Sequence, residues 1–376
     1  MSITIKSTPD DFSSAHEELW HVVDSTNKNG DGFRYVFDIY KDGDIITRVK
    51  SEPFGTDKYG VINVGTIVRS TLDSCELGGF DIYSQDAEFT MNTDVFFTDY
   101  QLRYGEDASG VITSNLASGN FRAYNNYTRL NFEKLDTSLS SGVIITSNRP
   151  TTLKSYTDSL SIFHPVVFSH RLNTGVNYRR EFRYADNSTE TRDVFGSGQC
   201  IVFPVTNTLC NRLRIINQDT SAVIKTYEIE NKCTKYECFT LVFLNAFGGY
   251  DSFTFVNGVL MQTGEKKSFE KQRWKLDGFT MKEKLYSGIY NESIMTYANM
   301  IKSKMKLTSD FLSTEEYAWL AELVNSPLVY LLRPGQDLIP VKITNTDYEF
   351  TNSLQNKAKL LEVEIEFGIV KNSQFR

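Results

Sequence analysis

Residues Phe33 to Lys50 read FRYVFDIYKDGDIITRVK and contain the clearest local pattern in the chain. Large apolar side chains take every second position from 33 to 39. The same period returns from 45 to 49, after a turn of Asp-Gly-Asp at 42–44. Alternation with a period of two on both sides of an Asp-Gly turn is typical of a β-hairpin. The sequence therefore predicts a hairpin over residues 33–50.

Several further segments read as strands. Residues Cys238 to Leu244 form a nearly continuous apolar run, which indicates a strand buried on both faces. From Leu361 to Ile369 apolar residues alternate with glutamates, so we expect one face against a core. Strands are also predicted over 88–104, 328–332 and 339–344, together with four short runs in the middle of the chain: 161–168, 199–205, 213–217 and 222–229.

Helical patterns are few. Ser313-Thr314-Glu315-Glu316 is a capping box, and apolar residues follow at helical spacing until Pro327, so a helix is predicted over 313–326. A second short helix is predicted over 63–72, capped by Asn63. Residues 105–160 are rich in Ser, Thr, Asn and Gly and are expected to form loops with short strands.

These patterns predict a mostly β, multidomain protein with β-sandwich-like domains and a few short helices. The predicted parts are an N-terminal β domain at 1–104, a β-rich insertion or second domain at 105–235, and an α+β domain at 236–376. A length of 376 residues is sufficient for two or three domains. Aromatic residues make up 13% of the chain, which also favours sheet.

The net charge of −7 argues against a dedicated nucleic-acid-binding protein, which usually carries a basic surplus. No apolar run approaches the roughly 18–20 residues of a membrane span, so none is expected. The first residues do not match a secretory signal, and the five cysteines are an odd number. We therefore expect a soluble protein made in a cytoplasm, without a disulfide framework.

Three groups of residues could be taken for metal sites. His16 and His21 are five apart and not four, so a helix would not place both on one face, and a surface segment is favoured. The segment 27–38 has the spacing of a calcium loop but only two acidic ligands, and an ordinary turn is favoured. Four cysteines lack the close pairs of a zinc site and are expected to be small buried residues: Cys200, Cys210, Cys233 and Cys238.

Catalytic signatures are missing from the sequence. There is no Gly-x-Ser-x-Gly elbow, and Gly196-Ser197-Gly198 lacks the rest of a phosphate-binding motif. His164 and His170 lie in a strand-like stretch, where a structural role is more common. We expect no enzyme activity and assign no catalytic, cofactor-binding or metal-binding residue.

Basic residues gather in two places. One cluster covers 266–284 around Trp274, and the second contains Lys302, Lys304 and Lys306. A basic stretch with an aromatic residue can hold phosphates, so non-specific contact with DNA stays open. A solvated face is the favoured interpretation, because glutamates are interspersed.

Both ends of the chain resemble virion structural proteins of tailed bacteriophages that infect Bacteroidetes, including crAss-like phages. The segments that carry the resemblance are 33–53, 61–72, 243–255, 319–330, 339–343 and 360–367. They amount to about half of the chain and leave 105–235 unexplained. The resemblance implies a tail, neck or ring component and supplies no catalytic residue.

The expected function is thus that of a structural subunit in the tail or neck of a phage virion. It would form a homo-oligomeric ring around the DNA channel, next to other tail, neck or portal proteins. The alternative is a receptor- or glycan-binding tail or surface module, in which Tyr124 and Tyr127 would form the stacking platform.

Overall fold

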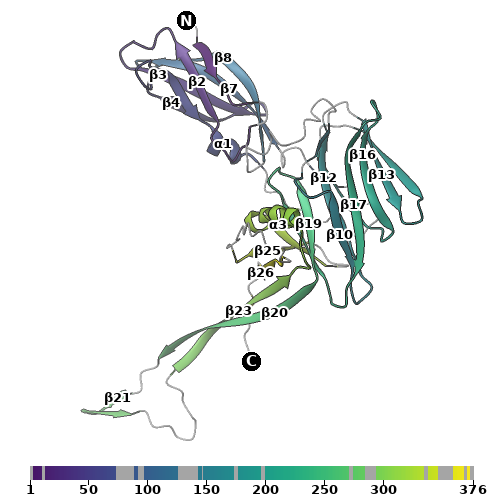
Figure 1. Cartoon of the computed structure of the whole chain (residues 1–376). Coiled ribbons are helices and arrows are strands. Elements are labelled where there is room, and N and C mark those ends of the chain that lie inside the picture. The colour runs from purple at the N-terminus through teal and green to yellow at the C-terminus, as the bar shows by residue number, and fades with distance from the viewer. Residues whose placement is uncertain are drawn as a thin grey trace.

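A computed structural model of the chain describes residues 3–10, 13–72, 89–91, 97–125, 143–145, 147–172, 177–195, 200–270, 274–283, 294–333, 338–345, 359–367 and 371–372. Figure 1 shows three β-rich parts and a long hairpin that leaves the third of them. The prediction of a mostly β chain with several sheets and a few short helices is confirmed.

The first part contains strands β1 (Ile3–Ser7), β2 (Trp20–Ser25), β3 (Phe33–Lys41), β4 (Asp44–Ser51), β5 (Gly60–Asn63), β7 (Phe97–Ala108) and β8 (Val111–Tyr124), and helix α1 (Gly65–Arg69). They form a three-stranded sheet, β1-β2-β5, and a four-stranded sheet, β4-β3-β7-β8. One buried cluster takes side chains from both sheets and from α1. The two sheets therefore pack as a sandwich.

The predicted hairpin at 33–50 is observed as β3 and β4. Lys41 pairs with Asp44, so the loop has two residues. Asp42 and Gly43 both have positive φ, 52° and 92°. A two-residue loop with two left-handed residues matches the twist of the flanking strands, which explains why Asp-Gly occurs here.

The expectation of loops and short strands from residue 105 is wrong for the first twenty residues of that segment. β7 continues to Ala108, and β8 pairs with it from Phe97↔Tyr124 to Ala108↔Val111. β8 is an edge strand with mostly exposed or half-buried side chains, so it can be rich in Ser, Asn and Gly. The predicted boundary after residue 104 falls inside β7, and the first sandwich extends to Tyr124.

The second part contains β6 (Phe89–Met91), β9 (Val143–Ile145), β10 (Thr152–Thr157), β11 (Phe163–His164), β12 (Val166–Leu172), β13 (Asn177–Tyr184), β14 (Thr189–Phe195), β15 (Cys200–Val205), β16 (Cys210–Asn217) and β17 (Val223–Cys233). One sheet has the order β11-β10-β17-β16-β13-β14 and the other β6-β15-β12-β9. A buried cluster shared by both sheets makes a second sandwich. The four predicted middle strands are confirmed as β11–β12, β15, β16 and β17.

β10 and β17 run parallel, from Thr152↔Glu228 to Thr157↔Cys233. The other described strand pairs are antiparallel. A parallel pair needs a long connection between its strands, and here the connection contains β11 to β16.

The third part contains β18 (Phe239–Leu244), β19 (Tyr250–Phe255), β20 (Asn257–Glu270), β21 (Trp274–Asp277), β22 (Thr280–Glu283), β23 (Ile294–Thr308), β24 (Val329–Leu332), β25 (Ile339–Ile343), β26 (Glu362–Phe367) and β27 (Lys371–Asn372), with helices α3 (Thr314–Trp319) and α4 (Ala321–Asn325). The main sheet has the order β19-β18-β24-β25-β26-β23-β20. β21 and β22 form a separate hairpin.

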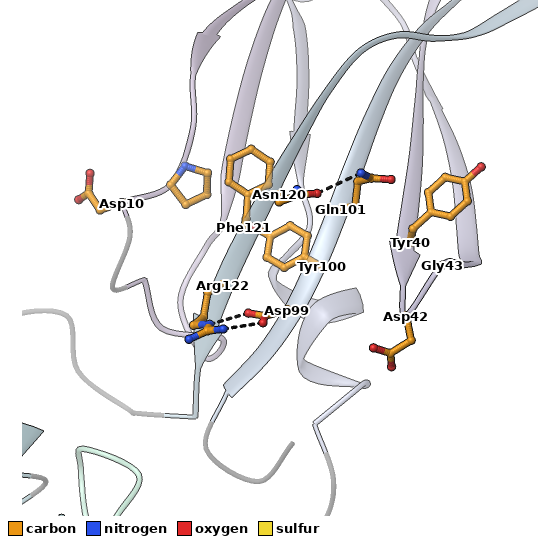
Figure 2. A pocket seen from close by; sticks show the side chains of 11 residues that line it. Asp10, Tyr40, Asp42, Gly43, Asp99, Tyr100, Gln101, Asn120, Phe121 and Arg122 are labelled. Carbon is orange, nitrogen blue, oxygen red and sulfur yellow. Dashed lines mark hydrogen bonds and ion pairs between the residues drawn. The ribbon is translucent and has the colours of Figure 1, made fainter. Parts of the chain in front are cut away.

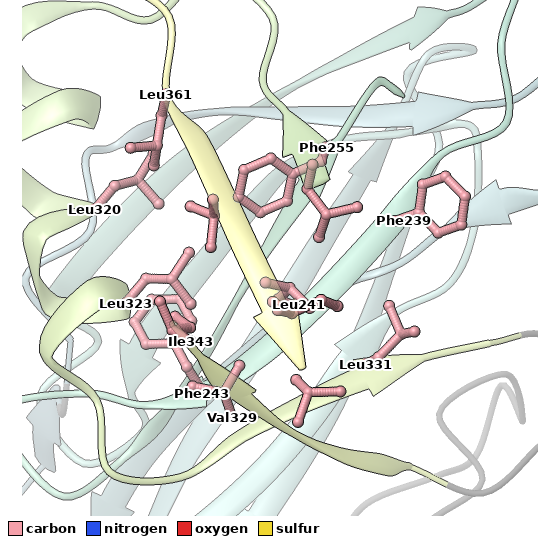
Figure 3. Packing of buried hydrophobic residues seen from close by; sticks show 14 of the residues in the cluster. Phe239, Leu241, Phe243, Phe255, Leu320, Leu323, Val329, Leu331, Ile343 and Leu361 are labelled. Carbon is pink, nitrogen blue, oxygen red and sulfur yellow. The ribbon is translucent and has the colours of Figure 1, made fainter. Parts of the chain in front are cut away.

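The core of the third part lies between this sheet and the two helices (Figure 3). Every residue of β18 is buried, as its apolar run predicts. In β26 Val363 and Ile365 are fully buried and Glu362 is exposed, so the alternation predicted for the last strand is also confirmed. Leu320 and Leu323 contribute the helical side of the core.

Two short helices were predicted from their capping residues. Capping by Asn63 is wrong, because the N-cap of α1 is Val64, which makes no side-chain cap hydrogen bond; Asn63 Oδ1 accepts a hydrogen bond from the Gly65 N–H. Ser313 Oγ accepts from the Glu316 N–H at 3.1 Å, and the Glu316 carboxylate accepts from the Ser313 N–H at 2.8 Å. The capping box is therefore confirmed, and the single helix predicted over 313–326 is observed as α3 and α4.

The second and third parts are joined by a buried ion pair. Arg149 Nε lies 3.3 Å from Asp251 Oδ1, and both side chains are fully buried. The guanidinium donates to the carbonyls of Val167 and Ser252, and Trp319 Nε1 donates to Asp251 Oδ2. Because a buried charge needs its partners, these bonds fix β12, β19 and α3 against one another.

Candidate assembly interface

The longest strand pair of the molecule forms an arm, which we define as β20 to β23. β20 and β23 pair from Asn257↔Thr308 to Glu270↔Ile294. At a rise of about 3.3 Å per residue, the fourteen residues of β20 span about 45 Å. Figure 1 shows this pair leaving the third part and pointing away from the first sandwich.

The inner end of the arm belongs to the core. Met305 and Leu307 of β23 are buried and pair with Ile365 and Val363 of β26. A Cβ added at Gly258 of β20 would lie 2.5 Å from the Phe239 ring. Glycine therefore allows β20 to pass this close to β18. The arm is thus anchored in the main sheet.

The edge strand β20 exposes apolar side chains, at Val259 and Leu260 near its inner end and at Phe269 toward its outer end. On β20 the exposed fractions are 55% for Val259, 56% for Leu260 and 48% for Phe269. β20 is also the last strand of the sheet in the described part of the chain. A long edge strand with exposed apolar side chains is a template for contact with another chain.

A second hairpin, which we call the tip, follows β20 in the sequence. β21 and β22 pair from Trp274↔Glu283 to Asp277↔Thr280, which leaves a two-residue turn. Figure 1 shows the tip beyond the far end of β20 and β23. Gly278 has a φ of 62°, and the Phe279 side chain is fully exposed.

The arm is basic, although the chain is acidic. Residues 257–308 contain ten Lys and Arg and five Asp and Glu, a formal charge of +5. The whole chain carries −7, so the remainder carries −12. Near the inner end Lys306 Nζ lies 2.8 Å from Glu362, and this hydrogen bond raises the pKa of Lys306. The arm and the rest of the molecule therefore have opposite charge.

A pocket of about 690 Å³ lies on the first sandwich (Figure 2). Tyr40 of β3, Tyr100 of β7 and Phe121 of β8 contribute aromatic rings to its wall. The other side chains that line it are Pro9, Asp10, Asp42, Asp99, Gln101, Asn120 and Arg122. The pocket thus combines an aromatic surface with polar groups from three adjacent strands and the turn between β3 and β4.

Hydrogen bonds between side chains fix the polar wall of the pocket. Arg122 donates to both oxygens of Asp99 at 2.6 Å, and this raises the pKa of the guanidinium. Gln101 Nε2 donates to Asn120 Oδ1 at 3.0 Å. The bidentate pair and the amide pair hold their side chains in defined positions on the sheet surface.

The two histidines at 16 and 21 form no metal site together. His16 Nε2 lies 2.7 Å from Asn125 Oδ1. His21 is on β2 and fully buried, with Tyr100 and Tyr104 hydroxyls at 3.1 and 3.2 Å from its ring nitrogens. Burial lowers the pKa of His21 to about 4. A surface position, as the sequence suggested, is wrong for His21.

The segment at 27–38 is a turn that leads into β3, as predicted. Asn27 Nδ2 donates to the Glu106 carboxylate at 2.9 Å. Asp38 lies within β3 and accepts two hydrogen bonds from Arg48, at 2.6 and 2.8 Å. Across the described ranges, no three His, Cys, Asp or Glu side chains are grouped so that they could hold a metal ion.

The prediction that the cysteines are small buried residues is confirmed for Cys210 and Cys238 and is wrong for Cys233. Cys210 and Cys238 are buried, and burial raises the pKa of the Cys210 thiol to about 11, whereas Cys233 is exposed. The Cys200 side chain lies outside the described residues. His164 and His170 are buried, and burial lowers the pKa of both imidazoles.

Tyr124, one of the two tyrosines predicted to form a stacking platform, is buried. Tyr124 ends β8 and is only 8% exposed, and Tyr127 lies outside the described residues. Tyr40 was not singled out from the sequence, yet it lines the pocket. The sequence could have indicated this, because Tyr40 is at one of the positions that alternate with the large apolar residues at 33–39.

The two basic clusters lie on the arm. Residues 266–270 belong to β20, residues 274–283 to the tip, and Lys302, Lys304 and Lys306 to β23. The antiparallel register places Val259 opposite Lys306 and Met261 opposite Lys304. These clusters are almost twenty residues apart in the sequence, and strand pairing brings them together on the arm.

No protein-family model and no curated protein matches this sequence. No described helix has the length and apolar character needed to cross a lipid bilayer. The arm, the pocket and the charge distribution are therefore the features of the molecule that bear on its function.

Proposed function

We propose that this chain is a structural subunit of a tailed-phage virion, and that copies of it assemble into a ring in the tail or neck around the DNA channel. The observation that carries the proposal is the arm, an anchored strand pair that projects from the body with apolar side chains exposed. The resemblance of both chain ends to phage virion proteins supports the virion assignment.

The arm is suited to a contact between copies. Its inner end is fixed by the core, so its outer end has a defined direction and little conformational entropy to lose on binding. The arm is basic, and the rest of every other copy of the chain is acidic. An arm that docks on a different surface of the next copy makes a heterologous contact, and such contacts close into rings when the rotation allows it.

The acidic balance of the rest of the chain suits a channel component. DNA that passes through a ring is repelled by acidic surfaces and does not adhere to them. The receptor- or glycan-binding alternative would use the pocket, because Tyr40, Gln101 and Asn120 offer a ring face and amide groups there.

The test measures the mass of the recombinant protein in solution by light scattering, followed by electron-microscope class averages. A matched variant has residues 262–303 replaced by Asn-Gly, which shortens the arm and retains its inner end. We expect closed rings or a discrete large oligomer for the natural chain, and monomers with an unchanged unfolding transition for the short-arm variant.

Val111→Ser is the control, because Val111 is an exposed apolar residue on an edge strand of the first sandwich. It should leave the oligomer intact. A natural chain that stays monomeric at high concentration and does not occur in purified particles would refute the proposed function.

A further inference from the structure

We infer that Phe279, at the tip of the arm, inserts into the pocket of the first sandwich in a neighbouring copy of this chain. The inference rests on the proposed assembly function and identifies the contact that would hold the ring together. It follows from three observations. The Phe279 side chain is fully exposed, the pocket has a suitable size and composition, and the arm that carries Phe279 is basic whereas the pocket is acidic.

Phe279 is presented as an anchor. The turn between β21 and β22 consists of Gly278 and Phe279, and the strands on both sides fix its ends. The side chain is fully exposed. Large exposed aromatic residues mark interaction sites, and the residues that dominate binding are aromatic anchors that fill a pocket on the partner.

The pocket can accept such an anchor. Its volume of about 690 Å³ lies within the range of roughly 300–1,000 Å³ that binding pockets have. Tyr40 and Phe121 are partly exposed and supply rings against which an incoming phenyl ring can pack edge to face, whereas Tyr100 lies buried behind them. The Asp99–Arg122 and Gln101–Asn120 pairs keep the polar side chains engaged with each other.

The charges of the two surfaces are complementary. The pocket contains the carboxylates of Asp10, Asp42 and Asp99 and one guanidinium, that of Arg122. The tip itself contains two lysines and two acidic residues, and the arm that carries it, residues 257–308, has a formal charge of +5. Opposite charge accelerates the encounter of two surfaces and fixes their register.

The arrangement of the molecule favours a neighbour over the same copy. Figure 1 shows the first sandwich and the tip at opposite ends of the molecule, with the third part between them. Anchor and pocket are different surfaces, so the contact is heterologous. Each copy then offers one anchor and one pocket, which is the requirement for a closed ring.

The experiment uses two full-length variants. Phe279→Ser removes the anchor and retains the pocket, and Asn120→Arg fills the pocket with a long cationic side chain and retains the anchor. Each variant alone should associate about 30-fold more weakly or worse, the effect of losing a dominant contact residue. Mixed in equal amounts, they should form a 1:1 heterodimer and no ring, since only one intact anchor and one intact pocket remain per pair.

Phe54→Ser is the control, because Phe54 is an exposed aromatic residue of the first part and does not line the pocket. It should assemble like the natural chain. Circular dichroism of all variants checks that they are folded.

Three outcomes would overturn the inference without contradicting the proposed function. If both variants form natural rings while the short-arm variant does not, the arm docks elsewhere. If Phe279→Ser assembles normally but loses retention on DNA, the tip contacts nucleic acid. Natural assembly by both variants, with oligosaccharide binding lost in Asn120→Arg, would likewise assign the pocket to a glycan. A monomeric natural chain would instead refute the proposed function itself.

Discussion

The inner and outer ends of the strand pair β20–β23 differ in what surrounds them. At the inner end Leu307 is fully buried and β23 lies between β20 and β26. Toward the outer end Phe269 is about half exposed, and β20 has no strand on its other side within the described residues.

The comparison shows that one continuous hairpin can serve two purposes. The inner end contributes to the stability of the body, where apolar surface is removed from water within the chain. The outer end retains apolar surface that is removed from water only when another molecule covers it. Substitutions in the body should therefore change unfolding, and substitutions in the arm should change assembly.

The largest effect on the body should come from the buried ion pair. Asp251→Ala leaves Arg149 buried without its carboxylate, which destabilises a protein by about 3–5 kcal/mol. Urea denaturation followed by fluorescence measures the loss. Asp193→Ala is the control, since it removes a solvent-exposed pair with Arg179 and should have a much smaller effect. Equal losses in both variants would contradict the buried arrangement.

The buried and the exposed strand of the hairpin can be compared near its inner end with one chemical change. Leu307→Ala on β23 opens a cavity in the core and should reduce the free energy of unfolding by about 2–5 kcal/mol. Leu260→Ala on β20 should change it by about 0.5 kcal/mol or less, because the side chain is exposed. Light scattering of Leu260→Ala should instead show weaker assembly. Similar unfolding losses for both substitutions would remove the distinction between the two strands.

Lowering the pH should destabilise the fold of the body before it weakens the contacts made by the arm. Burial lowers the pKa of His21 from 6.5 to about 4, so between these values the unfolded state binds a proton that the folded state does not. Stability is therefore lost as the pH falls from 6.5 to 4, by about 3 kcal/mol for this histidine, and is constant above 6.5 with respect to it.

His21→Gln should remove that part of the pH dependence in urea titrations. Residues 257–308 contain no histidine, so contacts made by the arm should keep their strength over the same range while the body remains folded. An unchanged pH profile in the variant would show that His21 does not titrate in this way.

The smallest expected effect concerns the helix that covers the core. Ser313→Ala removes the hydrogen bond to the Glu316 N–H and should cost about 1 kcal/mol in unfolding free energy. Ser313→Thr retains a hydroxyl acceptor and serves as the control. Thermal unfolding followed by circular dichroism compares the two. The oligomer should be unaffected in both variants.

Features that depend on neighbouring residues could be predicted from the sequence. The hairpin at 33–50 follows from its own alternation and its Asp-Gly turn, and the capping box from four consecutive residues. The burial of β18 follows from an apolar run that no exposed strand would carry. Each of these signals is complete within about twenty residues.

Features that depend on strand pairing could not be predicted. β8 has the composition of a loop, and its pairing with β7 makes it a strand. Tyr40 and Asn120 meet in one pocket because β3, β7 and β8 are adjacent, although eighty positions separate them. The arm is recognisable only once β20 is known to be the edge of its sheet, because exposure of Val259 and Leu260 is decided by which strand is absent beside them.

The parallel pairing of β10 with β17 has a consequence for the order in which the chain can fold during synthesis. The first sandwich has all its strands once residue 124 has been made. β10 is made next, but β17, its parallel neighbour, ends only at Cys233. Closing such a long loop is slow, since its entropy must be lost before the contact forms. We expect the N-terminal sandwich to fold first on the ribosome. β10 then lacks its parallel neighbour β17 until the middle of the chain has emerged.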